Sequence, residues 1–213
     1  MVFKFILRPV KKLLTLLIAL ASIAAVAQTP EPPPRPWAFE SDINFYFIPE
    51  DFFVLPVVRA DHKKLHFEGR FNYEDRNTFS AWVGYNFEGG KSLQYVITPM
   101  ASIVFGQTKG VASGLILELT FKRFELRTEA EYLFDSESVD NNFFYNWADL
   151  SYSANDWLSF GISGQRLRSY QTDLELQRGV LVCFTGKNLE ATAYYYNPGL
   201  DSAFLLLTLS AEF

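Results

Sequence analysis

The sequence predicts an all-β fold in which antiparallel strands form one barrel-like domain, and three observations support this prediction. Apolar and polar residues alternate along most of the chain after residue 36, which is the period of a strand and not of a helix. Turn-forming residues recur about every ten to fifteen positions, as in folds built from many strands. No stretch after residue 27 has the continuous apolar run of a membrane helix.

The first 36 residues are predicted to lie outside the barrel. Residues 1–12 contain four basic residues and no acidic one, and residues 13–27 are apolar and end in Ala25-Val26-Ala27. This order is typical of a cleaved secretory signal peptide, and the apolar run is too short for an uncleaved membrane anchor. Residues 28–36 are rich in proline and are predicted to be a periplasmic tether before a barrel of residues 37–213.

Composition narrows the classes of function. Without residues 1–27 the chain has 15 basic and 24 acidic residues, a formal charge of −9, which argues against nucleic acid as a partner. Cys183 is the single cysteine, so an intramolecular disulfide and a cysteine-based zinc site are excluded. We therefore expect neither a cofactor nor a metal.

Five strands are expected in the first half of the barrel. Residues 40–48 alternate cleanly, whereas residues 52–58 contain Pro56 and are predicted to be an edge-like or irregular strand. A charged turn is expected at residues 59–64. Three clearer strands follow at residues 65–74, 78–87 and 93–105. Pro99 in the last of them is expected to mark a bulge.

Seven strands are expected in the second half. They are predicted at residues 115–121, 124–132, 143–153, 157–168, 174–185, 189–196 and 202–213. A tight turn at Lys122-Arg123 joins the first two, and a polar loop at residues 135–142 follows the second. The total is about twelve strands, or ten if the barrel begins at residue 65. Twelve is favoured because residues 40–48 alternate so regularly.

The closing strand indicates the class of barrel. Its outward face is wholly apolar and consists of Ala203, Leu205, Leu207, Leu209, Ala211 and Phe213. A final strand of this kind resembles the C-terminal strand of bacterial outer-membrane β-barrels. The resemblance implies a transmembrane up-and-down β-barrel in the outer membrane, with Phe213 facing lipid and read by the barrel assembly machinery. Long strands with aromatic ends agree with this reading, and a soluble periplasmic barrel or sandwich is the alternative.

Charged residues on the strands are predicted to face the interior, because a charge facing lipid at mid-depth costs about 2–4 kcal/mol. These residues are His66, Glu68, Arg70, Glu118, Glu125, Arg127, Glu129 and Glu131. A two-residue turn at Lys122-Arg123 would place Glu118 directly opposite Arg127. A three-residue loop at residues 75–77 would place Arg70 opposite Trp82, within reach of a cation–π contact.

The acidic excess of this interior predicts a narrow channel for small polar or cationic solutes. A non-conducting structural or interaction barrel is the alternative, because about twelve strands lie between a filled barrel and an open pore. An outer-membrane lipid hydrolase is less favoured, because neither histidine has a serine two residues away on the same strand face. Arg166, Arg168 and Arg178 share the outward phase near a predicted outer loop and are predicted contacts for lipopolysaccharide phosphates.

Overall fold

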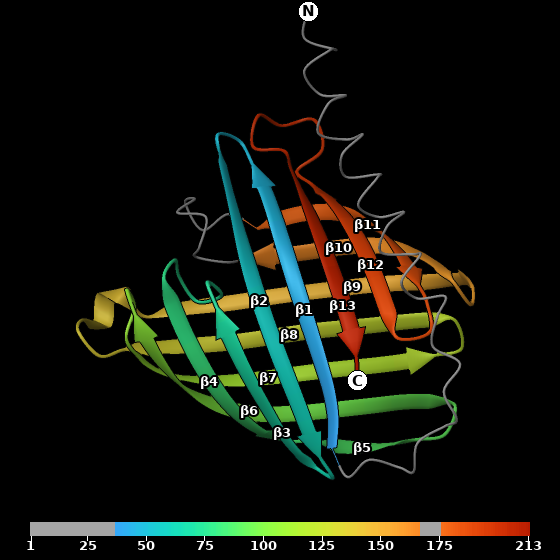
Figure 1. Ribbon diagram of the computed structural model, residues 1–213, viewed down its shortest axis with the longest axis horizontal. Coiled ribbons are helices and arrows are strands. Elements are labelled where there is room, and N and C mark those ends of the chain that lie inside the picture. The colour runs from blue at the N-terminus through green and yellow to red at the C-terminus, as the bar shows by residue number, and fades with distance from the viewer. Residues whose placement is uncertain (1–36, 167–175) are drawn as a thin grey trace, which may run out of the picture. The chain divides into compact units, whose positions relative to one another are not determined.

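The computed structural model describes residues 37–166 and 176–213, which form a closed antiparallel barrel of twelve strands with one extra strand (Figure 1). The strands are β1 (Trp37–Ile48), β2 (Asp51–His62), β3 (Leu65–Phe71), β4 (Thr78–Tyr85), β5 (Phe87–Gly90), β6 (Leu93–Gly106), β7 (Gly110–Phe121), β8 (Phe124–Asp135), β9 (Phe143–Asn155), β10 (Leu158–Arg166), β11 (Gln177–Thr185), β12 (Leu189–Tyr196) and β13 (Phe204–Glu212). A short 3-10 helix, η2 (Val139–Asn141), lies between β8 and β9. The prediction of about twelve strands is confirmed. The predicted signal peptide and tether lie outside the described residues.

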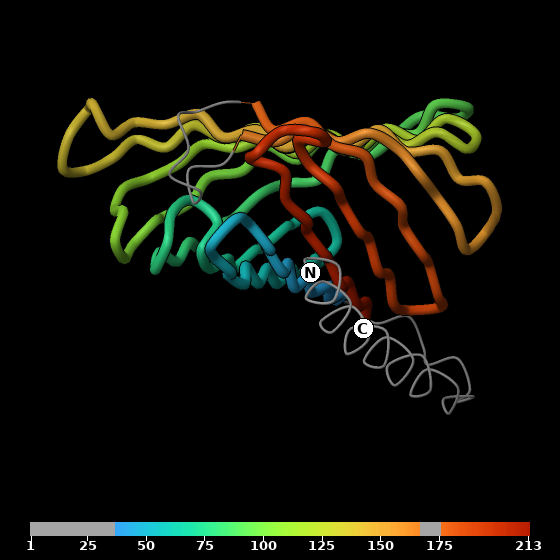
Figure 2. The backbone as a smooth tube through the Cα atoms, turned by 90° about the horizontal axis from the view of Figure 1, so that it is seen from above, coloured from blue at the N-terminus to red at the C-terminus, as the bar shows by residue number. Residues whose placement is uncertain are grey.

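Sequential antiparallel pairing builds the barrel and one pairing closes it. The last strand, β13, pairs with β1 so that Phe45 lies opposite Leu207, and the pairing of β4 with β6 completes the ring. In Figure 1 the front strands β1, β2 and β13 cross the back strands β7, β8 and β9 at a wide angle, as tilted strands of a closed barrel do. Figure 2 shows the two walls on opposite sides of the interior.

The extra strand, β5, continues β4 across an interruption at Pro99. Gly84 pairs with Met100 and Phe87 pairs with Ile97, so the register against β6 is unchanged on both sides. The expected bulge at Pro99 is therefore wrong. The Asn86 amide donates to the Lys64 carbonyl on the β3 side. The backbone N–H and C=O of the preceding residue, Tyr85, should therefore point toward β6. There the opposite residue is Pro99, which has no N–H to donate to the Tyr85 carbonyl. The ladder is interrupted because one donor is missing.

The prediction of an irregular strand at residues 52–58 and a turn at residues 59–64 is wrong. β2 is a regular strand of 12 residues, and its turn into β3 consists only of Lys63 and Lys64. Pro56 is tolerated because β2 pairs with β3 only from Val57 onward. The strand therefore needs no N–H toward β3 at Pro56. As a result, Arg59 lies within a strand.

Burial alternates along the strands with the apolar side chains outward. On β4, Phe79 and Val83 are exposed while Ser80 and Trp82 are buried. On β13, Leu205 is 54% exposed and Leu206 is 1% exposed. The terminal Phe213 is 65% exposed, and its amide donates to the Phe39 carbonyl on β1. The face of the closing strand that the sequence predicts to point outward is therefore the outward face in the structure.

Within residues 37–166 and 176–213, no helix has the length and apolar character needed to cross a membrane.

The connections differ at the two ends of the barrel. One end, the turn end, carries short links at residues 63–64, 91–92, 122–123, 156–157 and 186–188. The other, the loop end, carries longer links that include residues 72–77, 136–142 and 197–203. The described links therefore alternate between ends, as an up-and-down barrel requires.

Candidate functional site

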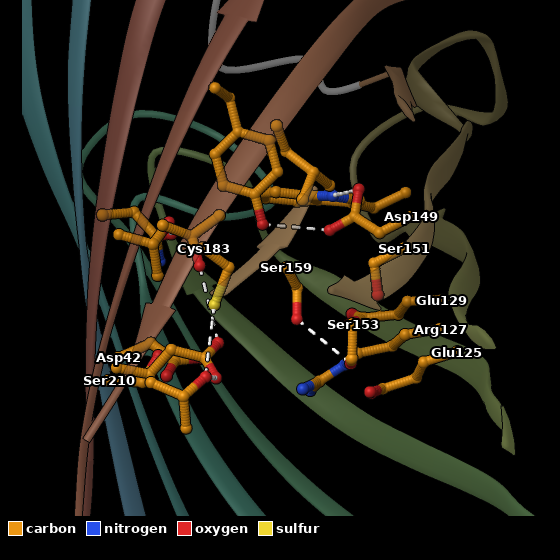
Figure 3. Close-up of a pocket in the computed structure, with 18 of the residues that line it drawn as sticks. Asp42, Glu125, Arg127, Glu129, Asp149, Ser151, Ser153, Ser159, Cys183 and Ser210 are labelled. Atoms are coloured by element: carbon orange, nitrogen blue, oxygen red, sulfur yellow. Dashed lines mark hydrogen bonds between the residues drawn. The ribbon is translucent and has the colours of Figure 1, made fainter. Parts of the chain in front are cut away.

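The interior of the barrel contains a cavity of about 560 Å³ that extends inward from the turn end (Figure 3). Lys122, Arg123 and Asp156 line its outer part, and Tyr73, Trp147 and Leu181 line its deep part. Its charged lining consists of Asp42, Arg59, Lys122, Arg123, Glu125, Arg127, Glu129, Asp149, Asp156 and Glu190. Six of these side chains are acidic and four are basic, so the lining has a modest acidic excess.

Asp149 on β9 is held by three side-chain hydrogen-bond donors. It accepts hydrogen bonds from Trp147 Nε1 at 2.9 Å, from the Tyr194 hydroxyl at 3.0 Å, and from the Ser163 hydroxyl. The Ser163 and Tyr196 hydroxyls lie 2.6 Å apart. Because these donors fix the carboxylate against the wall of β9 to β12, Asp149 is held in place whether or not a solute is present.

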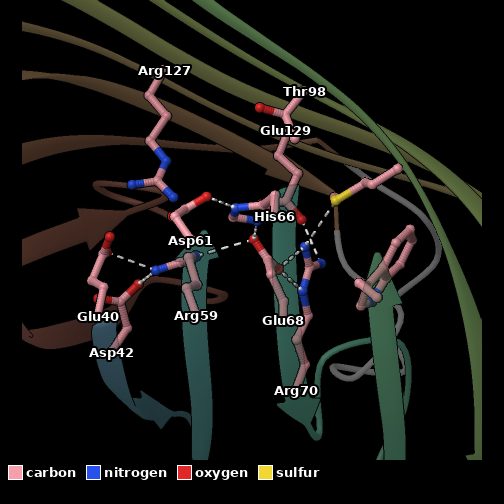
Figure 4. A network of polar contacts seen from close by, with 12 residues as sticks. Glu40, Asp42, Arg59, Asp61, His66, Glu68, Arg70, Thr98, Arg127 and Glu129 are labelled. Carbon is pink, nitrogen blue, oxygen red and sulfur yellow. Dashed lines mark hydrogen bonds and ion pairs between the residues drawn. The ribbon is translucent and has the colours of Figure 1, made fainter. Parts of the chain in front are cut away.

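Arg59 on β2 joins three carboxylates (Figure 4). Its Nη1 atom lies 2.8 Å from Glu40 Oε1 and 2.5 Å from Asp42 Oδ2, both on β1. Its Nε atom lies 3.2 Å from Glu68 Oε1 on β3. The Arg59 side chain is only 9% exposed, and a buried guanidinium needs partners of this kind.

Arg70 on β3 is the centre of a second cluster, which spans the interior. It pairs with Glu68 on its own strand, and with Glu129 at 2.5 Å and Glu131 on β8. Its guanidinium carbon lies 4.5 Å from the Tyr73 ring centroid and 4.8 Å from that of Trp82. Arg70 is 1% exposed. Since β4, β6 and β7 separate β3 from β8 around the barrel, this cluster bridges two distant walls.

His66 connects the two arginine clusters to the turn end. Its Nδ1 atom lies 2.9 Å from Asp61 Oδ1, and its Nε2 atom lies 2.7 Å from Glu68 Oε1. Both ring nitrogens therefore face carboxylate oxygens. Only the imidazolium form donates from both nitrogens, so the geometry fits a charged histidine that is part of the network.

The other three predicted interior residues lie near the turn end. Glu118 is opposite Arg127, as the turn geometry predicts, with 3.6 Å between Arg127 Nε and Glu118 Oε1. Both side chains are about one third exposed, at 35% and 38%. Glu125 is exposed and lines the cavity. The eight predicted residues thus divide into a buried group of five and a hydrated group of three.

The register predicted for Arg70 is wrong, although its contact with Trp82 forms. The link between β3 and β4 has six residues and not three, so Arg70 lies opposite Ser80 and Glu68 lies opposite Trp82. The Arg70–Trp82 contact is a diagonal one. Side chains as long as these reach diagonal neighbours on one face of a sheet.

The three arginines predicted on the outward face are placed differently. Arg178 is exposed on the same face of β11 as Val180 and Val182. Arg166 ends β10 with its guanidinium carbon 5.2 Å from the ring centroid of the buried Phe143. Arg168 lies outside the described residues. The structure therefore places one of the three on the exposed outer wall.

Sequence reasoning missed several residues of the interior. The sequence does not identify Asp42 and Arg59 as a pair, because Pro56 predicts an irregular strand that ends before Arg59. The alternation of residues along β9 could have predicted that Asp149 faces inward, because its neighbour Leu150 faces outward. The strand predicted at residues 65–74 is too long, because β3 ends at Phe71 and Tyr73 and Glu74 belong to a connecting loop. The alternation of a strand therefore does not predict their inward turn.

Aromatic side chains fill part of the interior toward the loop end. Tyr46 stacks on Phe53 with ring centroids 4.6 Å apart, and Tyr196 stacks on Phe204 at 4.9 Å. A 6.3 Å contact between Tyr46 and Phe204 joins the two pairs. All four are buried, so this aromatic layer, defined as Tyr46, Phe53, Tyr196 and Phe204, is a packed part of the interior.

Within the described ranges, no group of three or more His, Cys, Asp or Glu side chains is arranged to hold a metal ion.

No protein-family model matches the chain, and no curated protein matches its sequence. Solved structures of outer-membrane porins share its fold. The KdgM porin aligns with a TM-score of 0.60 at 10% identity, over 82% of this chain and 99% of that chain. A KdgM porin in complex with disordered oligogalacturonate aligns at 0.58 and 9%, over 82% and 98%. The NanC porin aligns at 0.53 and 10%, over 81% and 98%. At these identities the likeness shows the fold alone.

Proposed function

We propose that the chain is an outer-membrane β-barrel whose interior forms a narrow channel for small polar or cationic solutes. The outward face supports the membrane part of this proposal. Exposed Phe, Leu, Val and Tyr side chains cover it, while Arg70, Glu68 and Glu131 are buried inside. A soluble barrel would place its charges in water and its apolar face inside. Lipid is the partner that the outer face fits, and the assembly machinery is proposed to read β13 together with Phe213, which follows it.

The observation that carries the channel proposal is the 560 Å³ cavity with its acidic excess at the turn end. Rings of carboxylates favour cations over anions in a pore. Oligogalacturonate, the ligand named for one KdgM structure, is a polyanion. Six acidic side chains against four basic ones make this interior a poor match for such a ligand, so a small cationic or neutral polar solute is the better fit.

Planar-bilayer recording tests the proposal. The purified, refolded chain should give current steps that prefer cations, because the acidic lining concentrates cations near the turn end. The Glu125→Gln, Glu190→Gln double variant should lower that preference. A preference for anions in the unaltered chain would contradict the proposal. Equal selectivity of the unaltered and double-variant barrels would show that these carboxylates do not set it.

A non-conducting envelope barrel is the second candidate, and the aromatic layer favours it. Tyr46 and Tyr196 are 0% exposed and Phe204 is 5% exposed, so water does not reach these inward side chains. Complete electrical silence of a correctly folded barrel, together with an envelope defect on deletion, would support this candidate over the channel.

Arg178 is the outward arginine for which a lipopolysaccharide phosphate contact is still proposed. A guanidinium group can bind a phosphate through two parallel hydrogen bonds. Arg178→Gln should then reduce binding of lipopolysaccharide to the purified barrel. Arg166 is not used in this proposal, because its guanidinium lies over Phe143.

A further inference from the structure

We infer that residues 72–77, the link between β3 and β4, are a plug that closes the interior on the loop end. The inference rests on the proposed channel, for which such a plug would be the barrier. Connecting loops ordinarily run over the surface. In this link, Tyr73 is 4% exposed, Glu74 is 0% exposed and Asp75 is 7% exposed. The middle of the link is therefore turned into the barrel.

The plug reaches across the interior to a distant wall. The Tyr145 hydroxyl on β9 donates a hydrogen bond to the Glu74 carbonyl oxygen. Around the barrel, β6, β7 and β8 separate β9 from β4. From the near wall, Trp82 Nε1 donates to Glu74 Oε1 at 3.3 Å. A loop with contacts on both walls lies in the path that a solute would take.

Arg70 contacts the plug from the side that faces the turn end. Its guanidinium lies 4.5 Å from the Tyr73 ring centroid and is itself paired with Glu129 and Glu131 on β8. Tyr73 lines the deep part of the cavity. The cavity that begins at the turn end therefore meets the plug, and the charged cluster supports the point of contact.

The base of the plug is fixed by two asparagines with left-handed backbone. Asn72 has φ 60° and Asn77 has φ 51°, a conformation that asparagine tolerates better than most residues. The Asn77 amide donates to Asn72 Oδ1 at 2.8 Å. Thr108 Oγ1 donates to Asp75 Oδ2 at 2.8 Å and ties the plug to the link between β6 and β7.

The plug and the aromatic layer are joined side by side. Arg76 pairs with Asp51, and its guanidinium carbon lies 3.8 Å from the Phe53 ring centroid. The layer is made by side chains at the strands and their ends and cannot withdraw without disturbing the barrel. The plug is a connecting loop, so its withdrawal would break the contacts named above and no strand pairing. We therefore assign the movable part of the barrier to residues 72–77.

A loop variant tests the assignment. Tyr73→Gly, Glu74→Ser and Asp75→Gly together remove the three buried side chains in the middle of the link and keep its length. The matched control, Pro198→Gly, Leu200→Ser and Asp201→Gly, alters exposed residues of another loop-end link. Heat-modifiable gel mobility shows that each barrel folds. The plug variant should raise single-channel conductance or open probability about tenfold over the unaltered chain, and the control should not.

A second measurement does not depend on ion conduction. Ser151 lines the cavity, so Ser151→Cys in a Cys183→Ala background places one thiol beyond the plug. A membrane-impermeant cationic thiol reagent, added outside intact cells, should label this cysteine about tenfold faster when the plug variant is combined with it.

The outcomes separate the plug from the channel. Faster labelling with silent barrels supports the plug and contradicts the channel. Equal conductance of the unaltered and plug-variant barrels, with unchanged labelling, overturns the plug and leaves the channel standing. Silence with unchanged labelling overturns both. If the triple variant does not fold, the single variant Tyr73→Ser replaces it in both measurements, and the same outcomes apply.

Discussion

At the scale of single residues, burial decides which charge pairs matter for stability. Arg70 faces Glu68, Glu129 and Glu131 and is 1% exposed. Removing one partner of a buried pair leaves an uncompensated charge and costs about 3–5 kcal/mol. Arg70→Met should therefore lower the free energy of unfolding by about this amount, measured by tryptophan fluorescence in denaturant with the barrel in phospholipid vesicles.

A charge-compensating variant is the control for Arg70→Met. Glu131→Gln added to Arg70→Met removes one of the stranded carboxylates and should recover part of the lost stability. No recovery would mean that Arg70 acts by packing against Tyr73 and Trp82 and not by charge.

The Glu118–Arg127 pair should behave differently, although the sequence predicts it more directly. Its atoms are 3.6 Å apart and its side chains are 35% and 38% exposed, and exposed pairs contribute about 0–1 kcal/mol. A double-mutant cycle with Glu118→Gln and Arg127→Gln should give a coupling energy below about 1 kcal/mol. A coupling energy as large as the loss expected for Arg70 would show that water screens the Glu118–Arg127 pair less than the exposed fractions of its side chains indicate.

At the scale of the elements, β10 offers a test of how closely the strands pack. A Cβ atom at Gly161 would lie 2.2 Å from the Leu150 carbonyl oxygen, whereas at Gly164 the nearest atom is 3.8 Å away. Overpacking of this kind costs about 1–3 kcal/mol. Gly161→Ala should therefore destabilise the barrel, and Gly164→Ala on the same strand should change its stability by less than about 0.5 kcal/mol. Equal effects would contradict the packing argument.

The strands could be predicted because their two faces meet different surroundings. Apolar and polar residues therefore alternate along each strand. The exceptions lie where a single residue overrides that period. Pro56 sits at a position of β2 that β3 does not pair, which only the register reveals. Pro99 removes one donor without shifting the register, whereas a bulge would have inserted a residue. Sequence alone cannot distinguish these two effects of a proline.

The interior network was predictable only in part, for a physical reason. The alternation of residues along a strand tells which side chains face inward, and the two-residue turn at Lys122-Arg123 places Glu118 opposite Arg127. Neither tells which distant strands meet across the interior, so the contact of Arg70 on β3 with Glu129 on β8 is not visible in the sequence. The inward turn of residues 72–77 depends on these same cross-barrel contacts.

At the scale of the whole molecule, the arrangement is inverted relative to a soluble protein, and this inversion can be tested by depth. Leu207 lies near the middle of β13 on the outward face, and Ala211 lies near its turn end. Arginine facing lipid costs about 2–4 kcal/mol at the bilayer midplane and about 0–1 kcal/mol near the interface. In vesicles, Leu207→Arg should therefore lower the free energy of unfolding much more than Ala211→Arg does.

Thr208→Arg, on the inward face beside Leu207, separates lipid contact from strand position, because its charge would enter the polar interior near Asn44. If Leu207→Arg and Ala211→Arg cost the same, the outer face does not meet a bilayer, and the barrel would have to be a soluble one with its apolar face covered by another partner.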